Sequence, residues 1–189
     1  MHIMGFLDRP TSGIYKFRGK SIDDLTDDEL ARIRNKEMGF VFQTFNLLSR
    51  TTALDNVKLP LVYAGISSAL EEETAKEAIE TVGLPHRANH FPNQLAGGEQ
   101  QRVAIARAIV NRPSVIFADE PTGNLDSKSG QQIMDILQKL NEQGHTIILV
   151  THEKYTAEMA QRIIQLKDGK VVSDTKVDHQ RFAKDGLIK

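Results

Sequence analysis

The sequence predicts an α/β protein built on a mainly parallel sheet. Short apolar runs typical of buried strands occur at 39–42, 115–118 and 146–150, and apolar residues in the stretches between them recur at helical spacing. Strands that alternate with helices form parallel sheets, because each helix returns the chain to the same end of the sheet. Ligands of such sheets gather at the carboxyl ends of the strands, so the residues just beyond those ends are the first candidates for function.

The composition excludes several classes of protein. The 189 residues carry 24 Lys and Arg against 25 Asp and Glu, and 40% of them are hydrophobic, which excludes a disordered chain. Near-zero net charge argues against a nucleic-acid partner. The absence of cysteine excludes disulfides, thiolate metal sites and cysteine nucleophiles. Without a signal peptide or an apolar run of bilayer length, we expect one cytoplasmic domain.

Turn and capping residues define the elements in the first half of the chain. Residues 10–18 predict a turn and then a short alternating strand. Thr26 and Glu29 predict a capping box that opens a helix through about Arg34. The apolar strand at 39–42 follows and runs directly into the polar side chain of Gln43.

The elements of the second half follow from the same signals. Ser68 and Glu71 predict a second capping box, for a helix that ends at Gly83, and the helix after Gly98 stops at Pro113. The remaining elements are a helix with its apolar stripe at 133–140, closed by Gly144, the buried strand at 146–150, two short strands at 163–166 and 170–172, and a polar, peripheral tail at 174–189.

The residues that could take part in ligand binding or catalysis lie at two strand ends and in one loop. Asp119 and Glu120 leave the strand at 115–118, where one carboxylate could hold a divalent cation while the other orients or deprotonates a water; an acidic turn is the alternative reading. His152 follows the next strand, where it could place an imidazole or imidazolium beside the same cleft, although by itself such a residue is more often a solvated or capping one. Gly97 and Gly98 precede a helix, whose free amides and positive dipole end form an anion site.

These residues together resemble the ATP-binding-cassette (ABC) ATPases. The octet Leu95-Ala96-Gly97-Gly98-Glu99-Gln100-Gln101-Arg102 resembles the family's signature motif. Residues 115–120 resemble its Walker B strand with the catalytic glutamate, 123–126 its D-loop, His152 its switch histidine and Gln43 its Q-loop glutamine. Segments 7–13, 53–57 and 119–126 are most similar to the macrolide-export and lipoprotein-release branch, to which the septation-associated ATPases are near relatives.

The resemblance implies a fold and a set of partners. The fold is P-loop NTPase-like, a single partial ABC domain over 1–189 with its first strands and phosphate loop missing. It comprises a helical subdomain with the signature motif at about 46–110 and a Walker B to switch-histidine core at 111–173. The implied cofactors are ATP and Mg²⁺. The implied partners are a second ABC subunit, identical or equivalent and placed head to tail, and an integral membrane permease that holds the chain at the inner face of the cell membrane.

The resemblance also implies roles for individual residues. Asp119 and Gln43 are the implied ligands of Mg²⁺, Glu120 polarises the attacking water and His152 contacts the γ-phosphate. The residues implied to complete the nucleotide site of the opposite subunit, or to link the two sites, are Leu95, Ala96, Gly97, Gly98, Glu99 and Asp126.

The main departure from the family is the phosphate-binding loop. No Gly-x-x-x-x-Gly-Lys-Ser/Thr is present, and Gly19-Lys20-Ser21 follows Gly13 at a spacing one residue too long, so we interpret that stretch as strand and turn. Residues 1–7 resemble the helix that follows the loop, so we expect the chain to start just after it, roughly forty residues short of a family member. In the octet, Ala96 replaces the usual serine, and Glu99 stands where glutamine is commoner.

Three hypotheses follow. The first is the nucleotide-binding subunit of an ABC transporter, in which upstream residues restore activity. The second is a non-catalytic interaction module or a degenerate remnant, which ATP does not stabilise. The third is a non-transport member acting in DNA repair or translation; the absence of cysteine zinc sites, coiled-coil heptads and a second cassette disfavours it.

Overall fold

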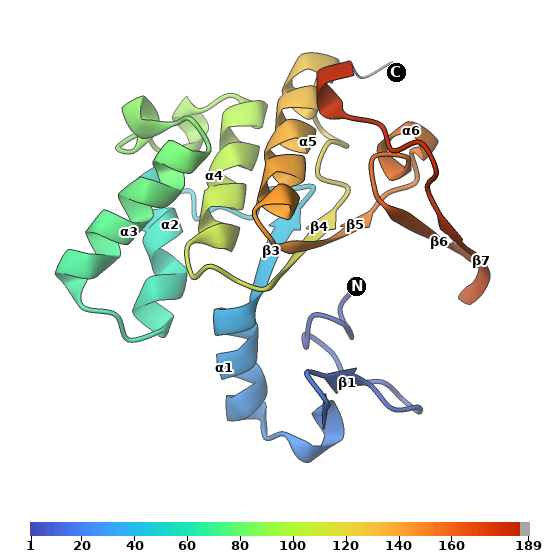
Figure 1. The fold of residues 1–189 in the computed structure, drawn as a ribbon. Helices are drawn as coiled ribbons and strands as arrows, with labels where there is room; N and C mark the ends of the chain where they lie inside the picture. Colours follow the sequence, from blue (N-terminus) through green and yellow to red (C-terminus); the bar gives the residue numbers. More distant parts are fainter. Residues whose placement is uncertain (186–189) are drawn as a thin grey trace.

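The computed structural model describes residues 1–185 and contains a parallel sheet, helices and two small hairpins (Figure 1). The strands are β1 Lys16–Phe17, β2 Lys20–Ser21, β3 Met38–Phe42, β4 Val115–Asp119, β5 Thr146–Val150, β6 Arg162–Lys167 and β7 Lys170–Lys176. The helices are α1 Asp27–Glu37, α2 Ala53–Tyr63, α3 Ser68–Thr81, α4 Gly97–Ile109, α5 Ser127–Glu142 and α6 Lys154–Ala157, with 3-10 turns at Ile22–Asp24, Pro85–Arg87, Pro92–Gln94 and Ala183–Asp185.

The central sheet is parallel, as the alternation of strands and helices predicts, with strand order β3-β4-β5. β4 lies in the middle, and its residues Ile116, Phe117 and Ala118 are almost fully buried. The prediction that β5 is equally buried is wrong, because Thr146 and Val150 at its ends are exposed and its central residues are only half-buried. β3 and β5 are both edge strands of this sheet among the described residues, but β3 is largely buried because helices α1 and α4 pack against it, whereas β5 has less helical cover.

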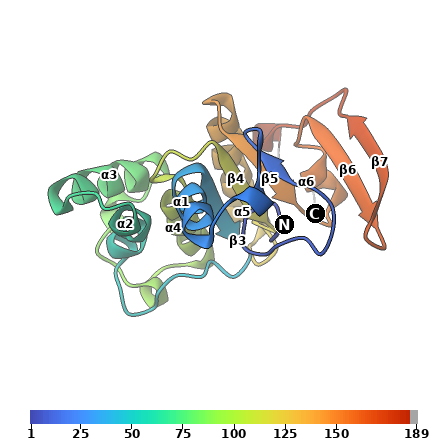
Figure 2. The same ribbon diagram turned by 90° about the horizontal axis from the view of Figure 1, so that it is seen from below.

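The sheet separates two clusters of buried apolar side chains, because successive residues of a strand point to opposite faces. Val41 and Ile116 face the helices α2 to α5. Phe117 faces the opposite side, where it stacks on Phe40 at 5.4 Å between ring centroids and joins Phe6 of the N-terminal segment. Figure 2 shows this segment crossing the sheet on the side away from α5. The N-terminal residues therefore form the second layer of the core.

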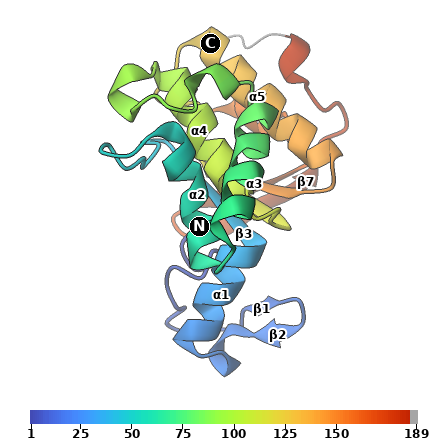
Figure 3. The same cartoon turned by 90° about the vertical axis from the view of Figure 1, so that its left-hand side faces the viewer.

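Helix α4 lies unusually close to β3. A Cβ atom built on Gly39 would lie 2.4 Å from the backbone oxygen of Ala108, so only glycine permits this approach. On its other side α4 packs against α2 and α3, and Figure 3 shows these three helices side by side. α2, for which the sequence patterns predicted no individual helix, is capped by the Thr52 hydroxyl, which accepts from the amide of Asp55 at 3.1 Å. The subdomain boundary at 46–110 stays a prediction.

The capping box predicted at Thr26 and Glu29 is confirmed, whereas the one predicted at Ser68 and Glu71 is wrong. Both hydrogen bonds of the Thr26 and Glu29 box are present, although α1 continues three residues past the predicted end at Arg34. In α3 the N-cap is Ser67, not Ser68, and its side chain makes no capping bond. Glu71 therefore occupies the fourth helical position, one too far along to bond back to the cap.

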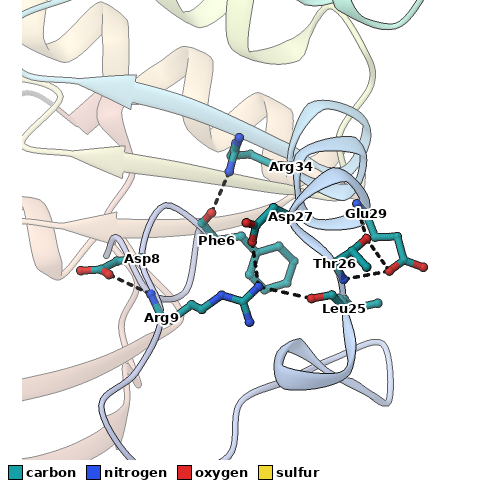
Figure 4. A network of polar contacts seen from close by, with 8 residues as sticks. All are labelled: Phe6, Asp8, Arg9, Leu25, Thr26, Asp27, Glu29 and Arg34. Atoms are coloured by element: carbon teal, nitrogen blue, oxygen red, sulfur yellow. Dashed lines mark hydrogen bonds and ion pairs between the residues drawn. The ribbon is translucent and has the colours of Figure 1, made fainter.

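The N-terminal residues do not form the regular helix that the resemblance implies. The amide of Gly5 donates to the carbonyl of Met1 at 3.0 Å, but Phe6 adopts a φ of +57° and ends the turn. This conformation places the Phe6 ring in the cluster beneath the sheet, while its carbonyl accepts from Arg34 at 2.7 Å (Figure 4). Arg9 binds Asp27 at 2.8 Å, so the segment is attached to α1 at two points.

The two hairpins follow the predicted turns. The Gly19-Lys20-Ser21 stretch is the turn and second strand of the β1–β2 hairpin, as predicted, with Gly19 at a φ of +80°. β6 and β7 join at Asp168 and Gly169, both at positive φ. The prediction of a peripheral tail at 174–189 is wrong in part. β7 extends to Lys176, and Ala183 is 1% exposed, because its backbone binds Gln131 and Gln138 of α5. Residues 186–189 lie outside the described residues.

Candidate functional site

The register of the sheet places the candidate residues at one edge. Phe42, Asp119 and Val150 are direct neighbours across β3, β4 and β5. The residues that follow them, Gln43 and Glu120 among them, therefore leave the carboxyl ends of three adjacent parallel strands, which is the edge where ligands of such sheets bind.

Glu120 is held by contacts of both its backbone and its side chain. Its φ of +46° lies in the left-handed region, and its amide donates to the carbonyl of Val150 at 2.9 Å. Glu120 Oε1 accepts from the backbone amide of His152 at 2.9 Å and lies 2.7 Å from His152 Nδ1, and Oε2 accepts from the Thr151 hydroxyl at 3.3 Å. Strained backbone of this kind persists where surrounding contacts hold it, and it clusters at functional sites.

His152 and Glu120 form an ion pair when the imidazole is protonated. The His152 side chain is 81% exposed, whereas that of Glu120 is 19% exposed. The hydrogen bond to the Glu120 carboxylate, together with its charge, raises the pKa of His152 above its ordinary value of about 6.5. The pair thus stabilises the folded chain fully below that ordinary value, and this contribution is lost as the pH rises through the higher pKa of the folded state.

We therefore expect Glu120→Gln to lower the pKa of His152 toward the ordinary imidazole value, since the substitution removes the negative charge and weakens the acceptor. NMR titration of the His152 ring protons measures this directly. The other histidine signals in the same spectra provide the control. A His152 titration curve that is identical in both proteins would show that the two side chains do not pair in solution.

Gln43 is bound to Asn124, a residue that the sequence patterns did not single out by itself. Gln43 Nε2 donates to Asn124 Oδ1 at 3.2 Å, and Asn124 Nδ2 donates to the backbone oxygen of Gln43 at 3.1 Å. A Cβ atom built on Gly123 would lie 2.6 Å from Gln43 Nε2, so the glutamine side chain rests against bare backbone.

Arg107 of α4 is a second contributor that the sequence analysis missed. It donates to the backbone oxygens of Phe45 at 2.9 Å and Asn46 at 2.5 Å, two residues with φ values of +60° and +50°. Burial lowers the pKa of the Arg107 guanidinium. The available signal in the sequence was a charged residue between apolar residues of α4, because a partly buried cation requires hydrogen-bond partners. Arg107 thereby anchors the loop that follows Gln43.

The octet and Asp126 form a second group, at the N-termini of α4 and α5. Glu99 Oε2 accepts from the amide of Ala96 at 2.9 Å and Glu99 pairs with Arg87, and these contacts lower the pKa of Glu99. Asp126 caps α5 by accepting from two backbone amides at 3.0 Å. A Cβ atom on Gly98 would lie 2.8 Å from the hydroxyl oxygen of Ser129, so Gly98 is also required for packing of α4 on α5.

The oxygen donors of the edge suit a hard cation that keeps other ligands. Asp119 supplies a carboxylate and Gln43 an amide oxygen, and Mg²⁺ typically takes one or two such protein ligands and completes its shell with phosphates and water. Within residues 1–185 no three His, Cys, Asp or Glu side chains gather into a metal site. The chemistry of these two oxygen donors therefore fits Mg²⁺ accompanied by a phosphate ligand.

Comparison with known proteins shows the family. A family model described as ABC transporter matches residues 1–123. The macrolide export ATP-binding/permease protein MacB of Chlorobaculum tepidum is 54% identical over 182 residues, which cover 96% of this chain but only 28% of that protein. YknY of Bacillus subtilis, described as an uncharacterized ABC transporter ATP-binding protein, is 53% identical over 172 residues, which cover 91% of this chain and 75% of the relative.

Solved structures agree with this assignment. A dimeric ATP-binding cassette in a post-hydrolysis state, bound to ADP and Pi, matches with a TM-score of 0.84 and 48% identity, over 94% of this chain and 79% of that one. Within residues 1–185 no helix has the length and apolar character needed to cross a bilayer. The P-loop NTPase-like fold expected from the motifs is thus confirmed, and the chain belongs to the ABC transporter family, with relatives in its macrolide-export branch.

Proposed function

We propose that this chain binds and hydrolyses ATP as the nucleotide-binding part of a macrolide-export-type ABC transporter. The observation that carries the proposal is the fixed Glu120 carboxylate at the end of the central strand, flanked by Asp119 and bound by His152. A carboxylate held in this way can accept a proton from an attacking water while neighbouring groups stabilise the phosphate charge.

Each residue of the edge has a role in this proposal. Glu120 orients the water and takes its proton. His152 uses Nδ1 on Glu120, which leaves Nε2 for a γ-phosphate oxygen. Asp119 and Gln43 Oε1 would hold Mg²⁺, which supplies charge neutralisation at the phosphates when it is bound.

The remaining residues of the proposal act between subunits. The relative bound to ADP and Pi is dimeric, and a second solved cassette is dimeric as well, at 48% identity. In a head-to-tail pair, Leu95 to Glu99 would approach the nucleotide of the partner, and Asp126 would lie at the contact between the two sites. The macrolide-export relatives are ATP-binding/permease proteins, which supports a membrane permease as the other partner and work on the inner face of the membrane.

One observation favours the second candidate, a non-catalytic module. Residues 1–189 contain no Gly-x-x-x-x-Gly-Lys-Ser/Thr to cradle the phosphates. The two candidates differ in what an added loop would do, because a catalytic site regains its phosphate cradle while a degenerate one does not.

We expect the 189-residue chain to bind Mg-ATP weakly or not at all, and the same chain preceded by a phosphate-binding loop and its feeding strand to hydrolyse ATP. Isothermal titration calorimetry measures binding, and phosphate release measures hydrolysis. A micromolar dissociation constant for the 189-residue chain would contradict the need for the loop. Continued inactivity of the extended, folded chain would favour the non-catalytic module.

A further inference from the structure

The pairing of Gln43 with Asn124 determines which end of the Gln43 amide is free. The backbone oxygen of Gln43 can only accept a hydrogen bond, so the Asn124 atom that lies 3.1 Å from it must be Nδ2. Asn124 therefore turns Oδ1 toward the Gln43 side chain. An oxygen can only accept there, so the Gln43 atom at 3.2 Å must be Nε2. Gln43 Oε1 is the other end of the same side-chain amide and points away from Asn124 Oδ1.

Two further contacts hold this arrangement. Gly123 has no side chain, and a Cβ atom there would lie 2.6 Å from Nε2 and 3.2 Å from Cδ of Gln43, so the amide occupies space that any other residue would fill. In the residues that follow Gln43, Arg107 donates to the backbone oxygens of Phe45 and Asn46. The backbone of the loop and the side chain of Gln43 are thus held independently.

We infer that Asn124 is a positioning residue of the nucleotide site, which presents Gln43 Oε1 to the bound cation and keeps Nε2 away from it. This inference rests on the proposed function, because it is the Mg²⁺ of an ATP complex that needs an oxygen ligand. A freely rotating amide would offer its NH₂ group as often as its oxygen, and an NH₂ group cannot bind a hard cation. The pairing removes the unproductive orientation before the nucleotide arrives.

The first test uses the 189-residue chain without nucleotide. Hydrogen exchange and chemical shift of the Gln43 side-chain amide, read by NMR, should change in Asn124→Ala, with exchange about fivefold faster, the effect of losing one exposed hydrogen bond. Asn124→Asp keeps an acceptor for Nε2 but loses the donor to the Gln43 backbone, so it should retain the Gln43 signals. Asn89→Ala is the matched control, because Asn89 is exposed and distant in sequence from both residues.

The outcomes show whether Asn124 orients the Gln43 side-chain amide or only supports the backbone of the loop. The inference is supported if the exchange rate and chemical shift of the Gln43 side-chain amide are retained in Asn124→Asp and changed in Asn124→Ala. Gln43 side-chain signals that are unchanged in Asn124→Ala overturn the inference. Signals that change in both variants overturn it too, because the hydrogen bond from Asn124 Nδ2 to the Gln43 backbone oxygen would then be the contact that matters. Unchanged backbone amide spectra in all variants show that the fold is intact.

The second test separates this inference from the proposed function. In the chain that carries a phosphate-binding loop, Asn124→Ala should raise the Mg²⁺ concentration for half-maximal hydrolysis about fivefold, and Asn89→Ala should leave it unchanged. An unchanged Mg²⁺ requirement in Asn124→Ala contradicts presentation of Oε1 to the cation. If no version of the chain hydrolyses ATP, the proposed function fails, while the orientation of the Gln43 amide is still decided by the nucleotide-free spectra.

Discussion

Replacing Glu120 by glutamine is expected to lower the kcat of ATP hydrolysis by a factor of about 10² to 10⁴, the usual contribution of a general base. Glutamine has nearly the same shape and can still accept a hydrogen bond from the His152 amide, which now reaches Glu120 Oε1 at 2.9 Å. It cannot take a proton from the attacking water. The loss should therefore appear in turnover while ATP binding is retained.

The experiment compares phosphate release and ATP binding in the extended chain with and without Glu120→Gln. Glu142→Gln is the control for the charge change, since Glu142 is exposed at the end of α5, just before the start of β5 and so at the opposite end of that strand from Val150. Full turnover in Glu120→Gln would remove Glu120 from the role of base. Loss of ATP binding together with turnover would indicate a damaged site rather than a missing proton acceptor.

Replacing Gly39 by alanine is expected to destabilise the chain by about 3 kcal/mol, at the upper end of the typical cost of overpacking. The new Cβ would lie 2.4 Å from the backbone oxygen of Ala108 and 3.1 Å from its carbonyl carbon. A backbone carbonyl cannot rotate away as a side chain can, so α4 must move off β3. That movement also shifts Arg107, the anchor of the loop after Gln43.

Urea unfolding followed by circular dichroism measures this effect. Gly97→Ala, in helix α4, is the control, because its Cβ would meet only Leu125 at 3.5 Å and Phe45 at 3.8 Å, which are ordinary contacts. Gly97→Ala should leave the midpoint nearly unchanged. A midpoint for Gly39→Ala that equals that of the unsubstituted chain would show that α4 does not pack on β3 as closely in solution.

The strands of the site were predictable from sequence because their signals are local. The runs at 39–42, 115–118 and 146–150 are apolar, short and bounded by polar residues, and each coincides with a strand of the parallel sheet. The capping box at Thr26 succeeded for the same reason. The one at Ser68 failed because either of two adjacent serines could start the helix, and the pattern alone did not choose between them.

The contacts that organise the site were not predictable in this way. Asn124 and Gln43 are 81 residues apart, and Arg107 lies 61 residues from Asn46, so no local pattern pairs them. Likewise, the sequence suggested that His152 lies near Glu120, but only the structure shows a direct bond between Nδ1 and the carboxylate. The exposure of β5 also depends on which elements pack against the strand, and its apolar sequence does not encode this.

The sequence by itself determined the family, the parallel sheet and the polar residues at its carboxyl edge, because motif spacing and apolar periodicity are properties of short segments. The tertiary structure alone decided the approach of α4 to β3 at Gly39, the pairing of Glu120 with His152 and the orientation of the Gln43 amide. These depend on which segments meet in space, and the energies that select them arise from packing and hydrogen bonds between residues far apart in the chain.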